Sequence, residues 1–169
     1  MNYAFRITDR LLKAIHHDLS RPHAFAYERV GHLHCRVGIQ ADRTVILAEE
    51  YRPVADTDYL PSDEAGAVIG PAAIRAALQH AYQRRDAVFH VHRHEHRGVP
   101  GFSRLDAREN ARCVPDFWKV SPAMPHGALV LSFDLAMGRV WCPTTRSSSE
   151  LRDITCIGPQ VRRLGGIHG

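Results

Sequence analysis

The sequence lacks several features that would place it in a specialised class of protein. Its four cysteines are far apart and form no C-x-x-C pair, which argues against a cysteine-ligated zinc site and against a redox motif. No apolar run approaches the roughly 18 residues that a membrane helix needs. The N-terminal segment carries charges where a secretory signal would be apolar. We therefore expect a cytoplasmic protein that does not enter a membrane.

Aromatic residues and clustered basic residues are also scarce. Aromatic side chains make up 8% of the chain, and its arginines are scattered, although the net charge is +4 and the pI is near 9.1. Nucleic-acid-binding faces typically combine a basic patch with interleaved aromatic residues. We therefore expect a solvated basic surface and no nucleic-acid partner.

The length and hydrophobic pattern indicate one α+β domain. With 169 residues, 44% of them hydrophobic, the chain can bury a core without disulfides or structural metal ions. It has no internal repeats and no linker, so we expect a domain over residues 1–164 and a flexible tail over 165–169. Helical and strand periodicities are interspersed, which predicts a layered arrangement of a mixed sheet with flanking helices.

Capping residues, prolines and apolar spacing locate the individual elements. Helices are expected from Thr8 or Asp9 until before Pro22, from Pro71, and from Ser103 to about Cys113. Loops are expected at Pro53–Glu64 and Ser147–Ser149. Strands are expected at Tyr27–Val37, Thr44–Tyr51, Ala87–His94, Ala128–Phe133, Arg139–Cys142 and Ile154–Ile157.

Histidine is the residue that is present in unusual density. The chain has 12 histidines, and four of them alternate in the run from His90 to His96. On a strand, Phe89 and Val91 point to one face and the even-numbered histidines to the other, with neighbours on a face about 6.6 Å apart. Where such a strand ends, two imidazoles spaced H-x-H can converge on one zinc ion. A single histidine of this kind is usually structural, but the alternation favours metal binding.

Ser103 and Asp106 follow the histidines after a turn at Gly98–Gly101. The spacing Ser-x-x-Asp fits a helix capping box, which is its simplest interpretation. A carboxylate at a helix start is also well positioned to complete a zinc site, so Asp106 is a candidate third ligand. The two interpretations are compatible.

His92-x-His94 followed by Ser103-x-x-Asp106 resembles the JAMM motif of the JAB/MPN metalloproteases. The family also carries an upstream Glu-x-x-Gly-x-Leu, which matches Glu28, Gly31 and Leu33 here. The segment that begins Pro125-His126-Gly127 is similar to the strand that follows the motif in the family. The resemblance spans roughly residues 7–135 and implies a JAB/MPN-like domain.

Two departures from the family pattern leave the histidine register open. Glu95 stands where the family has a proline, and the spacing from His94 to Ser103 is one residue longer than usual. The ligand pair could therefore be His90 and His92. We favour His92 and His94, because their distance along the chain to Ser103 is nearest that of the family.

The resemblance implies a catalytic role for each matched residue. Zn²⁺ would be held by His92, His94 and Asp106, with Glu28 as the general base for water and Ser103 as a hydrogen-bond donor to the oxyanion. The implied activity is a zinc-dependent peptidase or isopeptidase that cleaves after the C-terminal glycine of a ubiquitin-like protein. Implied partners are that substrate and ubiquitin-activating or ubiquitin-conjugating enzymes, in a bacterial conjugation or antiphage defence system.

Other functions fit the sequence less well. A metal amidohydrolase barrel needs about 250 residues, and a nucleobase deaminase needs a P-C-x-x-C element that is absent. The alternative from another class is a catalytically silent zinc-binding scaffold or interaction module. Glu28 distinguishes the two, because a scaffold has no use for a general base.

Overall fold

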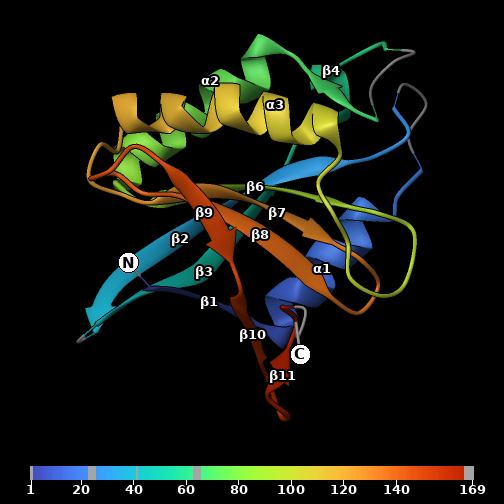
Figure 1. Cartoon of the computed structure of the whole chain (residues 1–169). Helices are drawn as coiled ribbons and strands as arrows, with labels where there is room; N and C mark the ends of the chain where they lie inside the picture. Colours follow the sequence, from blue (N-terminus) through green and yellow to red (C-terminus); the bar gives the residue numbers. More distant parts are fainter. Residues whose placement is uncertain (1, 23–25, 41, 63–65, 166–169) are drawn as a thin grey trace.

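The computed structural model describes residues 2–22, 26–40, 42–62 and 66–165, and shows an α+β protein built on one large mixed sheet. The sheet has nine strands in the order β11-β10-β1-β3-β2-β6-β7-β8-β9 and curls into a half-barrel (Figure 1). The strands are β1 Asn2–Thr8, β2 Val30–Gln40, β3 Arg43–Pro53, β6 Ala87–Arg93, β7 His126–Leu131, β8 Ala136–Trp141, β9 Ser148–Leu151, β10 Asp153–Ile157 and β11 Arg162–Arg163. A separate two-stranded sheet pairs β4 Tyr59–Leu60 with β5 Val68–Ile69.

Three α-helices cover the two faces of the large sheet. The helices are α1 Asp9–Leu19, α2 Pro71–Arg84 and α3 Arg104–Cys113. Helices α2 and α3 lie above the sheet and α1 lies on its other side (Figure 1). Two short 3₁₀ helices, η1 Asp56–Asp58 and η2 Val114–Lys119, connect these elements. None of the described helices is long and apolar enough to cross a membrane.

The local sequence explains where each α-helix begins. Thr8 caps α1 by accepting a hydrogen bond from the Leu11 amide, and Pro71 occupies the first turn of α2, where its missing amide proton costs nothing. The apolar stripe of α1 buries Leu12, Ile15 and Leu19 against the sheet.

The main core lies between α1 and the sheet. Phe89 and Val91 of β6 are fully buried there, together with Leu33 of β2 and Phe5 of β1. Strand β6 is an interior strand, antiparallel to β2 and parallel to β7. Because side chains alternate along a strand, the histidines of β6 and β2 face the α2 and α3 layer instead.

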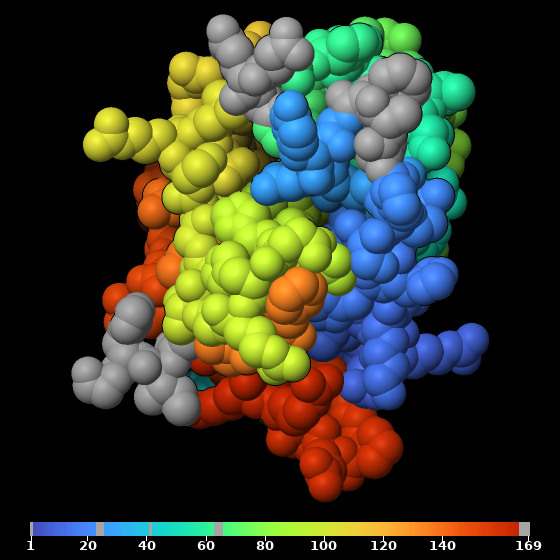
Figure 2. Space-filling model, turned by 90° about the vertical axis from the view of Figure 1, so that its right-hand side faces the viewer, coloured from blue at the N-terminus to red at the C-terminus, as the bar shows by residue number. Residues whose placement is uncertain are grey.

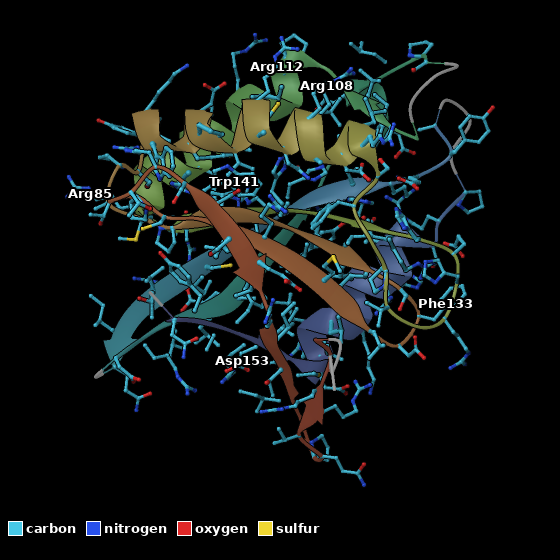
Figure 3. The ribbon with its side chains drawn as sticks, viewed as in Figure 1. Arg85, Arg108, Arg112, Phe133, Trp141 and Asp153 are labelled. Carbon is cyan, nitrogen blue, oxygen red and sulfur yellow. The ribbon has the colours of Figure 1, made fainter. Side chains whose placement is uncertain are left out.

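A smaller apolar layer lies beneath α2 and α3. Trp141 of β8 packs with Val114 and Ala128 in this layer, whereas Arg108 and Arg112 of α3 point away from the sheet (Figure 3). Val114 directly follows α3, so this layer packs the end of the helix against the sheet.

The expected helices agree with the structure, but two expectations about strands and loops were wrong. Ser147–Ser149 is not a loop, because Ser148 begins the edge strand β9, and Pro53–Glu64 contains η1 and β4. Strand β1 was not anticipated, although it lies between β10 and β3 in the sheet. Gly165, the first residue of the expected flexible tail, is still hydrogen-bonded to Ile154. Residues 166–169 of that tail lie outside the described residues.

Candidate metal centre

The histidine run lies where β6 ends. His92 is 1% exposed and faces the α2 and α3 layer, while His94 is half-buried just beyond the strand. The His94 amide donates a hydrogen bond to the Leu131 carbonyl, 2.8 Å away, which continues the pairing with β7 for one more residue. The rings of His92 and His94 therefore stay close together, with centroids 5.1 Å apart.

Glu28 reaches the histidines from the segment that precedes β2. Its carboxylate Oε1 lies 3.8 Å from His94 Nε2, and its amide donates to the Gly66 carbonyl at 2.9 Å. A Cβ on Gly66 would come within 2.8 Å of the Glu28 carboxylate, so a larger residue there would displace this side chain. Next to it, the buried Arg29 side chain donates to Asp56 at 2.7 Å and to two backbone carbonyls, which anchors the segment.

Gly31 and Leu33 of the Glu-x-x-Gly-x-Leu pattern have structural roles. Leu33 is fully buried in the main core. A Cβ on Gly31 would overlap the ring of Tyr51, whose hydroxyl donates to Asp18 at 2.6 Å. The glycine thus lets β2 and β3 pack at the point where the chain turns toward Glu28.

Asp106 and Ser103 enter the site from the start of α3. Ser103 Oγ accepts a hydrogen bond from the Asp106 amide at 3.1 Å, and Asp106 Oδ2 accepts one from the Ser103 amide at 2.8 Å. This reciprocal pair is the capping box expected from the sequence. The same Asp106 Oδ2 lies 3.7 Å from His92 Nε2, so the cap also directs the carboxylate at the histidines.

Three side chains at this site form a donor set that suits zinc, and the expected ligand Asp106 lies beside this group without being part of it. Glu28, His92 and His94 each offer a ligand atom within 4.8 Å of the other two. Ligands of one tetrahedral zinc at about 2.0–2.1 Å lie roughly 3.3 Å apart, close to the two carboxylate–imidazole distances. Neither ring nitrogen of the buried His92 has a hydrogen-bond partner among the described residues. Because an unpartnered buried polar atom costs free energy, a metal ion that accepts the lone pair of His92 would relieve this cost.

The surroundings hold the imidazole of His92 neutral, which is the form that binds metal. Burial, together with neighbouring His90, lowers the pKa of His92 to about 3. Burial, together with the nearby Asp106 carboxylate, raises the pKa of Glu28 to about 7. Burial alone would raise the pKa of Asp106 as well, but the Ser103 hydrogen bonds and the histidines bring it below its usual value.

His90 lies outside this group. Its ring centroid is 5.8 Å from that of His92 and 6.0 Å from that of His32. Among the described residues, the ligand atoms that gather with Glu28 belong to His92 and His94. The geometry therefore favours the His92/His94 register over the His90/His92 register.

The loop that connects β6 to α3 covers one face of the molecule. In Figure 2 this yellow-green segment lies at the centre, with the start of α3 in yellow beside it and the segment before β2 in blue above. Three stretches of chain thus meet at the site.

Sequence reasoning did not identify Gly66, since its role depends on the position of Glu28. It also did not identify a second group, which is formed by His34, His80 and Asp86.

Comparisons with known proteins give no assignment. No protein-family model matches the chain, and no curated protein sequence matches it. A solved structure of the STIL N-terminal domain from Trichoplax adhaerens resembles it at 14% identity and a TM-score of 0.42. The match covers 82% of this chain and 41% of that one, so the chain spans about two fifths of the length of the matched structure. A likeness at this level carries no argument about fold family or function.

Proposed function

We propose that the protein is a zinc-dependent peptidase or isopeptidase with a JAB/MPN-like domain. The observation that carries the proposal is the position of Glu28, which lies 3.8 Å from His94 although the two are far apart in sequence. A structural zinc site is closed by four protein ligands, whereas a hydrolytic site needs a carboxylate beside the metal that can move protons. Glu28 supplies that carboxylate.

His92, His94 and Asp106 would hold the zinc ion. When bound, zinc polarises the scissile carbonyl and lowers the pKa of water at the site. Glu28 accepts a proton from the attacking water and transfers it to the leaving amine as the carbon–nitrogen bond breaks. A raised pKa favours this shuttling, because the carboxyl group must both take up and release a proton near neutral pH.

Ser103 would stabilise the oxyanion that develops on the scissile carbonyl. Its Oγ accepts a hydrogen bond from the Asp106 amide, so its hydroxyl proton is free to be donated to the substrate. A donor of this kind typically contributes about 3 kcal/mol to transition-state stabilisation.

The proposed substrate is a ubiquitin-like protein cleaved after its C-terminal glycine, in processing or in deconjugation. An extended tail of this kind can bind by adding a strand to an exposed sheet edge. The two-stranded β4–β5 sheet offers such an edge near the site, since β5 begins two residues after Gly66, which contacts Glu28. Ubiquitin-activating and ubiquitin-conjugating enzymes would act on the same substrate in a bacterial conjugation or antiphage defence system.

A reporter assay tests this proposal. The substrate is a ubiquitin-like protein joined through its terminal glycine to a fluorescent reporter. We expect the zinc-loaded protein to release a product that ends at that glycine, and the release to stop with a chelator or with His94→Ala. His17→Ala, at an exposed position on α1, is the matched control and should cleave normally.

A catalytically silent zinc-binding scaffold is the competing function. Zinc binding by the wild-type protein with no cleavage of amide-linked or isopeptide-linked substrates would favour the scaffold. Cleavage that persists in His94→Ala would contradict the proposed site itself.

A further inference from the structure

A second group of metal-binding side chains lies on the same face of the sheet as the first. His34 projects from β2, His80 from α2, and Asp86 precedes β6. Each offers a ligand atom within 4.8 Å of the other two. Strand pairing sets His34 opposite Val88, two residues beyond Asp86, so the β2–β6 register brings the histidine and the carboxylate together.

The members of this group are buried. The side chain of His34 is fully buried, that of Asp86 is 2% exposed and that of His80 is 13% exposed. The rings of His34 and His80 meet edge to face with centroids 4.2 Å apart. Helix α2 thus packs one imidazole directly against the other.

His34 and Asp86 are spaced like two ligands of one ion. Nδ1 of His34 lies 3.2 Å from Asp86 Oδ1, close to the roughly 3.3 Å between neighbouring ligands of a tetrahedral zinc. A bound ion would therefore take the place of this hydrogen bond, with both atoms as ligands.

Structural ion pairs account for only part of the cluster. Arg84 donates to Asp86 Oδ2 at 3.2 Å and to Glu50 Oε2 at 3.3 Å. The other carboxylate oxygen of Asp86 is directed at His34 instead. Glu50 Oε2 also lies 3.3 Å from His80 Nε2, which places another oxygen donor beside the group. The arginine thus orients both carboxylates.

We propose that His34, His80 and Asp86 form a second zinc site, with Glu50 as a fourth donor. Two histidines and two carboxylates would supply the four nitrogen and oxygen donors of a tetrahedral zinc. Bound zinc would tie α2 to β2 and to the start of β6, in a region where α2 otherwise buries small alanine side chains. The proposal is independent of the hydrolase function, because it uses none of the residues of the first site.

Counting bound zinc in variants tests the second site. The protein is stripped with a chelator, titrated with Zn²⁺ against a chromophoric competitor, and measured by elemental analysis. We expect two zinc ions per wild-type chain and one in the double variant His92→Ala/His94→Ala. Adding His80→Gln to the double variant should remove the last ion. His80 is partly exposed on a helix, so its replacement should leave the fold intact, as far-UV circular dichroism would check.

Two further variants make the result decisive. His80→Gln alone should reduce zinc from two ions to one and lower the melting temperature of the zinc-loaded protein toward that of the stripped protein. His17→Gln, at an exposed position on α1, should change neither quantity. The second site is refuted if the double variant binds no zinc, or if His80→Gln leaves zinc content and zinc-dependent melting unchanged.

Discussion

The Glu28 carboxylate lies 3.8 Å from His94 Nε2, although one residue precedes β2 and the other follows β6. The two strands are antiparallel neighbours, with Val30 opposite His92, so the chain just before β2 meets the chain just after β6. The antiparallel register therefore brings the carboxylate to the histidines. This geometry makes the roles of the surrounding residues testable one at a time.

Glu28→Gln should keep its zinc and lose nearly all activity. The amide preserves the size of the side chain but cannot accept and release a proton, so we expect a loss of about 10²–10⁴-fold in kcat. Elemental analysis and the reporter assay give the two quantities. A loss of zinc as large as that in His94→Ala would show that Glu28 is a metal ligand and not the base.

Asp106→Ala should weaken zinc binding and abolish cleavage. The substitution removes a carboxylate that lies 3.7 Å from His92 Nε2 and also half of the capping box. Asp106→Asn is the informative comparison, because its side-chain oxygen can still accept from the Ser103 amide. Zinc affinity, measured with a chromophoric chelator, should fall in both variants, whereas thermal stability should fall mainly in Asp106→Ala. Unchanged zinc affinity in Asp106→Asn would assign this residue to the helix cap alone.

Ser103→Ala should lower kcat with zinc retained, and should also destabilise the protein. Loss of an N-cap side chain typically costs about 1 kcal/mol, whereas replacement by glycine costs only a few tenths. Ser103→Gly therefore separates the two roles. We expect a near-normal urea midpoint for Ser103→Gly but the same fall in kcat, of the order of 10²-fold or more, as in Ser103→Ala. Normal turnover in both variants would leave Ser103 with the cap as its function.

Acid should destabilise the protein through its buried histidines, and His126 is a clear case. His126 is fully buried, accepts a hydrogen bond from the Val88 amide and contacts the Ser121 carbonyl, and burial lowers its pKa to about 4. Above pH 6.5 the ring is neutral in both the folded and the unfolded state. Between pH 6.5 and about 4 only the unfolded chain takes up the proton. The free energy of unfolding therefore decreases as the pH is lowered, by up to about 3 kcal/mol for this residue.

Urea unfolding at intervals from pH 7.5 to 4.5 measures this dependence. His126→Gln should lower stability at neutral pH but show a shallower decline toward acid, since one group has been removed from the titration. An identical slope in the two proteins would mean that His126 does not contribute to the acid sensitivity.

Strands β1 and β9 show where sequence reasoning failed. The N-terminal segment alternates Tyr3, Phe5 and Ile7 as buried residues, a strand pattern that is short and adjoins a strong helix signal. Its identity as an interior strand depends on parallel pairing with β10, which lies at the far end of the chain. Ser148 and Ser149 have low strand propensity and become a strand because the edge of β8 is available for pairing.

The sequence by itself determined the features whose cause is local. The capping box of Ser103 and Asp106, the proline at the start of α2 and the alternation along β6 depend on neighbours within a few residues, and each could be read before the fold was known. Only the tertiary structure decided which donors meet. Glu28 joins His94, and His34 joins His80 and Asp86, through strand register and helix packing, because these bring together segments with no local interaction in the chain.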